Sequence, residues 1–487
     1  MRVVFVYPDL IGSADYGGIY YLGIGILSGV LKQAGYETAL VHITQPTAAA
    51  EVARQILKQT PDLIAFSSTT PMFSVVQEWA HAAKQQLPHI PIIVGGVHAI
   101  LHAEAVSAVP DIDFVCIGEG EDALPELCRA LTGGGDTAGI ANIWSKKDGR
   151  VMRTPLRPII SDLDRIAFAD RQLFDYPRLM EAREAMIFVM ASRGCPYSCP
   201  YCCAESLRNL LAGKRSWVRF RSVANVIAEI QAALAVFPRT KFIGFYDDIL
   251  ALDTEWFKEF SVKYKKEVGV PFRCNMRANL MGEEIVRLMH EAGCRRVILG
   301  VESGNEYVRN AILKRGMSED VLLAAARRCK RYGMELVTNN MIGLPGESAR
   351  AVLDTVKINA RMDVDFTYTS IFYPFPKTAL YDVAAAQGLL TGRVITDFVE
   401  GSTLNFDPLT ITRLVFVRNF FRPLMNLYKS VYRLPRRIAA ILERLLDGLL
   451  TALPTVALVF PPANAMFRLV RENRVLAAIV NRFKKYR

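Results

Sequence analysis

The stretch SRGCPYSCPYCC, residues 192–203, places four cysteines within nine positions of a 487-residue chain that has nine cysteines in total. It follows AMIFVMAS, a largely apolar run typical of a buried β-strand. Cys195, Cys199 and Cys202 have the spacing CxxxCxxC, and thiolates at that spacing can surround one small inorganic core. Cys203 adjoins Cys202, and adjacent side chains point in different directions. We therefore expect Cys203 to lie outside the ligand set.

The number of cysteines in this loop favours an iron–sulfur cluster over zinc. A four-iron cluster normally takes four cysteine ligands, so three would leave one iron open to a substrate. Structural zinc usually takes two separated pairs of ligands, and the chain has no second CxxC. The remaining cysteines are isolated in the sequence and are expected to be small buried apolar side chains: Cys116, Cys128, Cys274, Cys294 and Cys329.

The N-terminal stretch MRVVFVYPDL lacks the basic and long apolar regions of a signal peptide and is interpreted as a first β-strand. We therefore expect a cytoplasmic protein, in a reducing compartment where clustered cysteines favour metal binding or redox chemistry. The apolar fraction of 51% and the charged fraction of 22% are those of a folded protein, and the length suggests about two to four domains.

A regular alternation of strands and helices surrounds the cysteine loop. Six β-rich runs between residues 186 and 390 are each followed by a helical pattern: AMIFVMAS, KFIGFYDD, FRCNMRA, RRVILGVES, ELVTNNMIG and TYTSIFYPF. Six such units predict a partial (β/α)6 barrel of the TIM type, since a complete barrel has about eight. The cysteine loop then follows the first strand, at the end of the barrel where active sites lie.

Residues 1–135 predict a doubly wound, Rossmann-like α/β domain. Its expected strands are nearly all apolar, as in a parallel sheet covered on both faces: RVVFVYP, ETALVHI, DLIAFSS, PIIVGG and DFVCIGEG. Ligands of such sheets bind at the carboxyl ends of the strands, where small residues let the backbone approach closely. The candidate binding residues at these ends are Ser67, Ser68, Thr69, Gly95, Gly96, His98, Gly118, Glu119 and Gly120. Alternatively the glycines only turn the chain, and the lack of GxGxxG after the first strand disfavours a nicotinamide cofactor.

Two further segments complete the chain. Residues 136–185 are rich in Pro, Asp and Arg and are interpreted as an irregular linker. Residues 391–487 are predicted to form a basic, apolar helical region. From residue 401 onward the chain holds 15 Lys and Arg against 4 Asp and Glu, whereas residues 1–400 hold 44 of each.

The C-terminal region allows several interpretations. Apolar helices that carry clustered Arg are typical of segments at an anionic membrane surface. Residues 448–467 are uncharged and long enough to span a bilayer, but their three prolines disfavour a straight spanning helix. An ordinary helical cap on the barrel is the other alternative. The long apolar runs between the cations disfavour a nucleic-acid-binding arm.

The motifs together resemble one enzyme family. RGCPYSCPYC, with Tyr201 before the third cysteine, looks like the signature loop of radical S-adenosylmethionine (radical SAM) enzymes. In that family the open iron of a [4Fe-4S] cluster binds S-adenosylmethionine, and reductive cleavage gives a 5′-deoxyadenosyl radical. The resemblance assigns SAM contacts at three later strand ends: Asp247 and Asp248 to the methionyl amino group, Glu302 and Ser303 to the ribose, and Gly343, Pro345 and Gly346 to the adenine.

The N-terminal domain extends this resemblance. GGIYYLGIGILSGVLKQAGYE, IIVGGVHA and VCIGEGE are similar to the cobalamin-binding domain of the class B methyltransferase subclass. The stretches SDLDRIAFADR and FYPFPKTALYD match as well, so the resemblance covers roughly residues 1–390. The motif Asp-x-His-x-x-Gly is absent, which implies that cobalt lacks a histidine ligand and that His98 lines the loop or contacts the corrin periphery.

The function that the resemblance implies is methylation of an unactivated carbon, with one SAM methylating cobalamin and a second providing the radical. A radical SAM cyclase or rearrangement enzyme without net methyl transfer is an alternative, and a non-catalytic cobalamin or iron–sulfur sensor or scaffold is another. The C-terminal region favours a lipid-like substrate such as a hopanoid or other polyprenoid. An electron donor such as flavodoxin or ferredoxin is expected, and no catalytic side chain is singled out.

Overall fold

The computed structural model describes residues 1–10, 17–147, 149–213, 216–393 and 402–472. The chain divides into two compact units. Of the described residues, the first unit comprises 1–10, 17–196 and 204–243, and the second comprises 197–203 and 244–472, apart from the gaps given above.

The first unit contains a seven-stranded sheet in the order β2-β1-β3-β4-β5-β6-β7. Its five parallel strands confirm the predicted ones: β1 Arg2–Pro8, β2 Glu37–Ile43, β3 Leu63–Ser67, β4 Ile92–Gly95 and β5 Phe114–Cys116. Because they are rich in Val, Ile and Phe, they bury side chains on both faces. The strand order reverses between β1 and β3, which is where ligands of doubly wound sheets bind.

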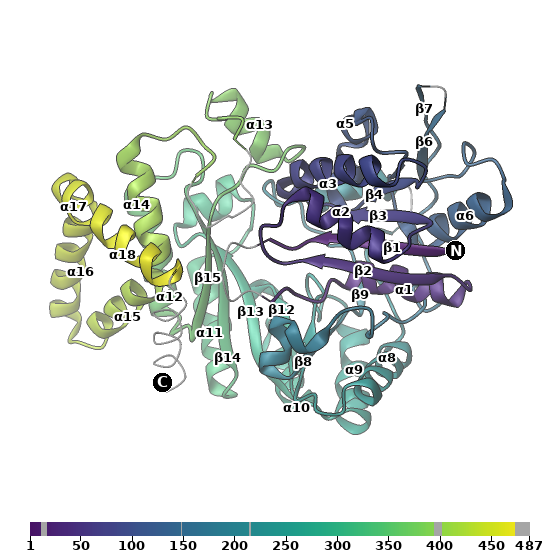
Figure 1. Ribbon diagram of the computed structural model, residues 1–487. Coiled ribbons are helices and arrows are strands. Elements are labelled where there is room, and N and C mark those ends of the chain that lie inside the picture. Colours follow the sequence, from purple (N-terminus) through teal and green to yellow (C-terminus); the bar gives the residue numbers. More distant parts are fainter. Residues whose placement is uncertain (11–16, 148, 214–215, 394–401, 473–487) are drawn as a thin grey trace. The chain divides into compact units, whose positions relative to one another are not determined.

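Helices cover both faces of this parallel sheet (Figure 1). Helix α1, Leu22–Gln33, packs with α6, Gly120–Gly133, on one face. Helix α2, Ala49–Lys58, packs with α3, Phe73–Gln86, on the other. Two short helices, α4 Val97–Leu101 and α5 Ala103–Ala108, join β4 to β5. The core between sheet and helices includes Val4, Val6, Ile64, Phe66, Val76 and Trp79. The doubly wound fold is therefore confirmed.

The prediction of an irregular segment over residues 136–185 is wrong at residues 143–152. Strands β6, Ile143–Lys147, and β7, Arg150–Met152, extend the first sheet in antiparallel orientation. Ile143 and Ser145 are buried while the residues between and after them are less so, which is the alternation of a half-covered strand. This alternation covers only three residues before two lysines, so it was too short to indicate a strand. From residue 153 to 185 the chain forms bends, turns and two short 3-10 helices, Tyr176–Arg178 and Met180–Glu184.

The second sheet has six strands in the order β15-β14-β13-β12-β11-β8. They confirm the six predicted strands: β8 Met186–Val189, β11 Phe242–Phe245, β12 Phe272–Met276, β13 Cys294–Glu302, β14 Glu335–Ile342 and β15 Phe366–Ile371. The pairings from β12 to β15 are all parallel. The sheet is open, a parallel half-barrel, as six rather than eight units require.

The helices that follow these strands mostly begin at residues that cap them. They are α8 Val223–Val236, α9 Thr254–Glu267, α10 Glu283–Ala292, α11 Glu319–Arg331 and α12 Ala349–Arg361. In four of them a side-chain oxygen of the residue before the helix accepts the backbone N–H three residues on; these capping residues are Ser222, Asp253, Ser318 and Ser348. Such caps contribute about 1 kcal/mol each and fix where the helix begins.

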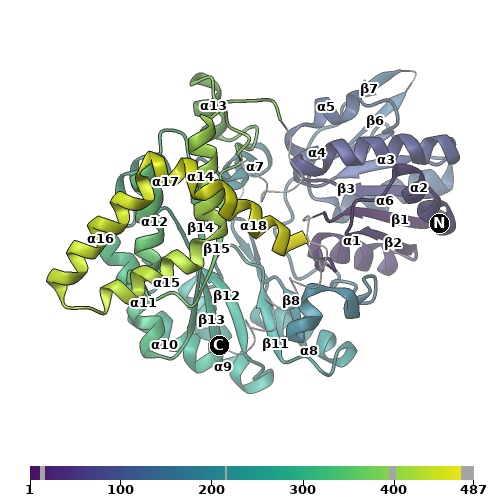
Figure 2. The ribbon, with the colours of Figure 1, turned by 60° about the vertical axis from the view of Figure 1, so that its left-hand side comes forward.

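The C-terminal region is helical where it is described. After α13, Ala379–Ala386, come α14 Pro408–Asn419, α15 Phe421–Tyr432, α16 Arg436–Thr451, α17 Leu453–Leu458 and α18 Phe460–Glu472. Helices α14, α15 and α16 pack against α12 (Figure 2). In the described residues no single helix is long and apolar enough to cross a membrane. The pair Arg436–Thr451 and Pro454–Leu469 reaches the required length and composition together, with a bend of 56° between them.

Candidate active site

The cysteine loop begins in the first unit and continues in the second. Strand β9, Ser192–Arg193, leads into it and pairs antiparallel with β10, Arg219–Phe220. Gly194 has a φ of +92°, and a Cβ there would lie 2.4 Å from the Trp217 carbonyl oxygen. Only glycine fits this position, so the backbone turns sharply just before Cys195. Cys195 is partly exposed.

The later cysteines of the loop lie close to one another in sequence and structure. Cys199 is buried and Cys202 partly exposed, and the Cys202 N–H donates to the Cys199 carbonyl at 3.0 Å. Cys203 begins helix α7, Cys203–Leu211, and its hydrogen bond with Cys202 lowers the pKa of the Cys203 thiol. Among the described residues, no three His, Cys, Asp or Glu side chains are grouped to hold a single metal ion.

Two buried arginines approach the sulfur of Cys199. Arg277 Nη1 lies 3.9 Å from Cys199 Sγ, and Arg315 Nη1 lies 4.0 Å from it. Both guanidinium groups are buried, so their charges are weakly screened by water. Two cations beside one sulfur suit a thiolate that carries the negative charge of an iron–sulfur cluster. The residues around Cys199 therefore fit such a cluster.

Each arginine is held in place by further contacts. The Arg277 guanidinium lies over the Tyr197 ring, 3.8 Å from its centroid, and Arg277 Nε donates to Asn279 Oδ1 at 2.9 Å. Arg277 Nη2 also donates to the carbonyl of Arg315. Arg315 Nη1 donates to the Tyr201 hydroxyl at 2.7 Å. The two cations are therefore fixed before any cofactor binds.

Glu302 joins this cluster at the end of β13. Its Oε1 lies 3.8 Å from Arg315 Nη1, and burial raises its pKa, against the opposing effects of Arg315 and of a hydrogen bond with Tyr201. Glu302 has a φ of +67°, a conformation that costs a non-glycine residue about 1–2 kcal/mol. A Cβ on Gly300 would lie 2.6 Å from Glu302 Oε1, so a larger residue there would displace the Glu302 carboxylate. Strain of this kind concentrates at functional sites.

Sequence analysis did not identify Arg277 and Arg315. Arg277 directly follows β12 and stands in the quoted run FRCNMRA, so its position at a strand end was a usable signal. Arg315 lies in a loop sixteen residues after Leu299 of β13, and nothing in its neighbourhood marks it. The structure does bring together three residues that were predicted: Cys199, Tyr201 and Glu302.

The other predicted SAM contacts lie at the expected strand ends. Asp247 follows β11 and is buried, and its backbone carbonyl accepts from Asn275 Nδ2 at 2.8 Å; Asp248 is exposed. Ser303 is fully buried, and its hydroxyl oxygen accepts the Asn305 N–H at 3.3 Å. The assigned roles of these side chains stay predictions.

The turn after β14 contains a carboxylate that sequence analysis did not single out. Gly343 and Gly346 have positive φ angles of 79° and 75°, and Pro345 between them is buried. Glu347 Oε2 accepts the N–H groups of Gly343 at 2.6 Å and Leu344 at 3.2 Å. Burial raises the pKa of Glu347 to about 7, and its Oε1 has no hydrogen-bond partner among the described residues.

In the first unit, two of the predicted glycines are closely surrounded by other groups of the protein. A Cβ on Gly96, whose φ is +91°, would lie 2.7 Å from the Ser68 carbonyl oxygen. A Cβ on Gly118 would lie 2.7 Å from Asn142 Nδ2. Contacts of this kind within the protein do not by themselves indicate a ligand, so the roles of both glycines stay predictions. The remaining small residues at these strand ends are Ser67, Thr69, Gly95 and Gly120.

His98 offers a different signal at the same edge of the sheet. It is buried, its Nδ1 lies 3.1 Å from Thr70 Oγ1, and its ring packs on Phe73 and stacks on His102 at centroid distances of 4.3 and 4.7 Å. Burial, aided by His102, lowers the pKa of His98 to about 4, so the ring is neutral. His98 Nε2 has no hydrogen-bond partner in the described part of the chain. A buried polar nitrogen of this kind fits a site for the polar periphery of a cofactor.

Glu119 is engaged by protein groups on three sides. Its carboxylate accepts from Arg193 at 3.0 Å, from Arg219 at 2.9 Å and from the backbone N–H of Ile160 at 2.6 Å. Arg193 also pairs with Glu121 at 2.5 Å. The loop after β5 is thus tied to the residue two positions before Cys195. The predicted contact of Glu119 with a cofactor stays a prediction.

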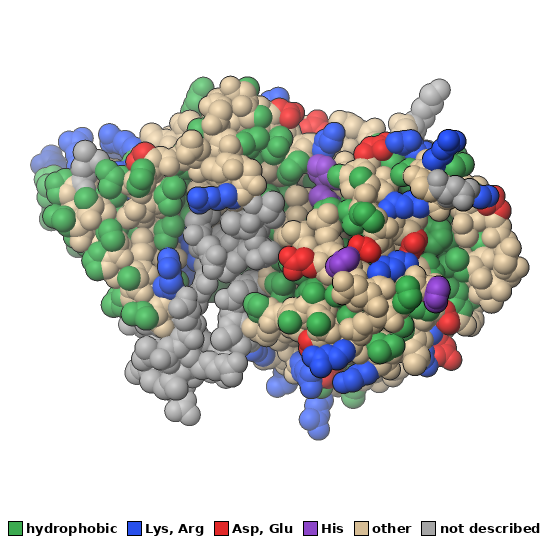
Figure 3. All heavy atoms as spheres, turned by 45° about the horizontal axis from the view of Figure 1, so that its top comes forward, with side chains coloured by type: hydrophobic (Ala, Val, Ile, Leu, Met, Phe, Trp, Pro, Cys, Tyr) green, Lys and Arg blue, Asp and Glu red, His purple; other side chains and the backbone are tan. Residues whose placement is uncertain are grey.

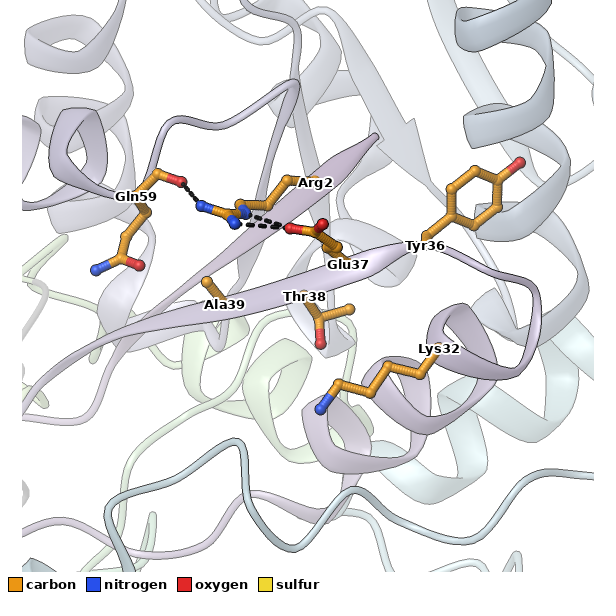
Figure 4. Close-up of a pocket in the computed structure, with 7 residues that line it drawn as sticks. All are labelled: Arg2, Lys32, Tyr36, Glu37, Thr38, Ala39 and Gln59. Atoms are coloured by element: carbon orange, nitrogen blue, oxygen red, sulfur yellow. Dashed lines mark hydrogen bonds and ion pairs between the residues drawn. The ribbon is translucent and has the colours of Figure 1, made fainter.

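A hollow of the first unit lies away from these strand ends. Figure 4 shows a cavity of about 440 Å³ lined by Arg2, Lys32, Tyr36, Glu37, Thr38, Ala39 and Gln59. Arg2 donates to Glu37 Oε2 at 2.6 Å and to the Gln59 carbonyl at 3.1 Å within it. Arg2 and Glu37 begin β1 and β2, so the hollow is at the amino ends of the strands, opposite the edge where ligands bind.

Two family models match this chain. The B12-binding domain matches residues 10–128, and the radical SAM superfamily matches residues 189–358. The first range contains the Rossmann-like strand ends, and the second contains the cysteine loop, Arg277 and Arg315.

Three proteins are similar in sequence to this chain over most of their length. An uncharacterized methyltransferase of Pyrococcus horikoshii is 29% identical over 371 residues, covering 76% of this chain and 79% of the relative. The anaerobic magnesium-protoporphyrin IX monomethyl ester cyclase of Rubrivivax gelatinosus is 26% identical over 402 residues, covering 78% and 69%. The cytidylyl-2-hydroxyethylphosphonate methyltransferase of Streptomyces wedmorensis is 24% identical over 419 residues, covering 73% and 76%.

Two solved structures share the fold. The radical SAM methyltransferase TsrM of Kitasatospora setae superposes with a TM-score of 0.65 at 19% identity, covering 79% of this chain and 76% of that chain. The cobalamin-dependent SAM radical enzyme OxsB superposes with a TM-score of 0.68 at 16% identity, covering 96% and 75%.

Proposed function

Because this chain is a cobalamin-dependent radical SAM enzyme, with a B12-binding domain before a radical SAM domain, we propose that it methylates an unactivated carbon of a lipid-like substrate. The observation that carries the site assignment is the pair of buried guanidinium groups about 4 Å from Cys199 Sγ, with Glu302 beside them.

The proposal gives each part of the site a role. Cys195, Cys199 and Cys202 hold the cluster, and Arg277 and Arg315 balance its negative charge at Cys199. When bound, the cluster supplies the electron that cleaves SAM, and cobalamin carries the methyl group. A flavodoxin or ferredoxin provides the electron in the cytoplasm.

The strand ends around the cluster hold SAM in this proposal. Glu302 would accept hydrogen bonds from the ribose hydroxyls, and its ion pair with Arg315 restricts the movement of its carboxylate. Asp247 and Asp248 would bind the methionyl ammonium group, and the turn at Gly343 would contact the adenine. Asp247, Ser303 and the two arginines are buried, which keeps water from this part of the site and would protect a reactive radical.

Methyl transfer is supported by the relatives named as methyltransferases. The similarity to the magnesium-protoporphyrin IX monomethyl ester cyclase favours a second candidate, radical ring formation without net methyl transfer. The two differ in their use of SAM. Methylation yields both S-adenosylhomocysteine and 5′-deoxyadenosine for each product, whereas cyclisation yields no S-adenosylhomocysteine.

A lipid-like substrate is supported by the composition of the C-terminal helices. Large apolar side chains of α16, α17 and α18 are exposed in the second unit, and the segment from residue 401 onward is strongly basic. Hopanoids and other polyprenoids are apolar hydrocarbons with unactivated carbons, so they fit this chemistry, and we propose that the enzyme acts on one of them at the cytoplasmic face of a membrane.

The test is anaerobic turnover with the full chain, reductant, cobalamin and SAM, offered a polyprenoid lipid extract. We expect a product heavier by one methylene group, with S-adenosylhomocysteine and 5′-deoxyadenosine formed together. The matched control replaces the neighbouring thiol, Cys203→Ser, and should keep activity, whereas Cys199→Ser should lose it. Formation of 5′-deoxyadenosine without S-adenosylhomocysteine would support the cyclase instead, and neither product would contradict both candidates.

A further inference from the structure

Helix α16 presents its apolar side chains to solvent rather than to the protein core. Ile441, Leu445 and Leu449 are 59%, 63% and 57% exposed, and Ile438 is exposed as well. These residues are spaced three and four apart, so they share one face of the helix. The neighbouring helix α15 has the usual arrangement, with Phe421, Leu424, Met425, Tyr428 and Val431 buried. The exposed face of α16 is therefore a distinct feature and not a property of the whole region.

The opposite face of α16 carries its acidic groups inward. Lys357 of α12 is buried, and its Nζ lies 2.9 Å from Asp447 Oδ2 and 3.3 Å from Glu443 Oε1. The Tyr428 hydroxyl donates to Asp447 Oδ1 at 2.7 Å. The carboxylates of α16 are thus paired with donors from α12 and α15, and these contacts fix the rotation of α16 about its axis. The apolar face is outward because the ion-paired face is anchored inward.

The residues that flank the apolar face are cationic. Arg433, Arg436, Arg437 and Arg444 are exposed. Within the described part of the chain no ion pair engages any of these four side chains. Both acidic residues of α16 are the ones turned toward Lys357, so the outward side of this helix carries positive charge only.

The apolar surface continues into the next two helices. Leu458 and Val459 at the end of α17, and Met466 and Leu469 of α18, are exposed. Helices α16 and α17 pack together, as do α17 and α18. Figure 3 shows hydrophobic and Lys/Arg side chains side by side on the left-hand end of the molecule, over these C-terminal helices.

We propose that this surface of α16 to α18, defined by Ile438, Ile441, Leu445, Leu449, Leu458, Val459, Met466 and Leu469, docks onto an anionic lipid bilayer. The apolar side chains enter the acyl boundary, and the arginines beside them bind lipid phosphates. The 56° bend after Thr451 suits helices lying in the interface better than one crossing it. The proposal specifies where the lipid-like substrate of the proposed function would be encountered.

Charge disfavours two other occupants of this surface. A second copy related by a two-fold axis would bring the same arginines face to face across the interface. Residues 473–487 contain five Lys and Arg and no Asp or Glu, so they would meet this surface with like charge. A bilayer rich in anionic lipid has the opposite charge and an apolar interior, so it complements both components of the surface.

The test is co-sedimentation of the full chain with two kinds of vesicle, one of phosphatidylcholine alone and one of equal parts phosphatidylcholine and phosphatidylglycerol. We expect binding at least about tenfold tighter to the anionic vesicles, weakened as salt rises from about 0.1 M to about 1 M. The double variant Ile441→Gln with Leu445→Gln should bind at least about tenfold more weakly, because two inserted side chains are lost. Val262→Gln, at another exposed apolar position, is the matched control and should bind as the unaltered chain does.

Each outcome decides for or against the surface. Equal binding of the double variant and the unaltered chain would overturn the proposal, as would equal binding to both vesicle types. Self-association that the double variant abolishes, without vesicle binding, would assign the surface to a second copy. Vesicle pellets that resist alkaline carbonate would show a spanning segment instead. Because binding is measured without turnover, a chain that docks but does not cleave SAM would refute the proposed function and leave this inference standing.

Discussion

Removing the positive charge beside Cys199 should make the iron–sulfur cluster harder to reduce. The variants are Arg277→Gln and Arg315→Gln, which keep polar side chains but delete the guanidinium charges 3.9 and 4.0 Å from Cys199 Sγ. A cation near the cluster stabilises its reduced, more negative state. Loss of that cation therefore lowers the reduction potential.

The size of the effect follows from these distances. Two unit charges about 4 Å apart interact by about 4 kcal/mol at an effective dielectric constant of about 20. The added electron is spread over the whole cluster, and Glu302 already offsets part of the Arg315 charge, so we expect about a quarter of this, about 1 kcal/mol, for each arginine. Since 59 mV corresponds to about 1.4 kcal/mol for one electron, the expected shift is about 40 mV to more negative potential per variant.

The assay is anaerobic potentiometric titration of the reconstituted full chain, with the reduced cluster followed by electron paramagnetic resonance. Arg277→Lys retains the charge and should shift the potential less than Arg277→Gln. Arg287→Gln, which removes a surface guanidinium paired with Glu291, should not shift it at all. An unchanged or more positive potential in both Gln variants would refute the electrostatic role of these arginines.

Three further predictions concern stability. Because burial raises the pKa of Glu347 from 4.5 to about 7, the carboxyl must ionise at a cost as pH rises through this window. The folded protein thus loses up to about 3 kcal/mol of stability over this pH range. Glu347→Gln should therefore gain stability relative to the unaltered chain between pH 5 and pH 8 in thermal melts. A stability difference between the two proteins that stays constant with pH would contradict this. Glu119→Ala leaves Arg193 and Arg219 without their shared carboxylate and should cost about 3–5 kcal/mol in chemical denaturation, whereas an effect below about 1 kcal/mol would show that solvent replaces the pairing. Gly96→Ala should lower the free energy of unfolding by about 1–3 kcal/mol, because the Cβ would meet the Ser68 carbonyl at 2.7 Å. Gly95→Ala is the control and should lower it less, because its Cβ would lie 3.6 Å from Cys116. Equal losses of unfolding free energy in the two variants would contradict the packing argument.

The two sheets could be predicted from the sequence because strands that are buried on both faces consist mostly of apolar residues. The runs RVVFVYP and RRVILGVES are apolar along most of their length, and both form central parallel strands. Cys199 was identifiable from the cysteine spacing of its loop, and Glu302 because it ends a strand within a recognisable motif. The hairpin of β6 and β7 was missed because its buried alternation is three residues long before Lys146 and Lys147.

The charge network of the site could not be predicted in the same way. Arg315 is 116 positions from Cys199, and their approach depends on how β13 and the following loop fold. The pairing of Glu119 with Arg219 joins residues 100 positions apart. No local sequence pattern predicts such contacts, because the residues around a loop arginine do not indicate whether its side chain contacts water or a buried sulfur. The apolar face of α16 was visible as composition, but its outward orientation depends on Lys357 of α12.

The most direct test of the central claim is the metal content and SAM reactivity of the full chain purified without air. We expect about four irons and one cobalt per chain, with 5′-deoxyadenosine released from SAM on reduction and no such release in Cys199→Ala. A zinc centre, or a cluster that leaves SAM intact under reducing conditions, would contradict it.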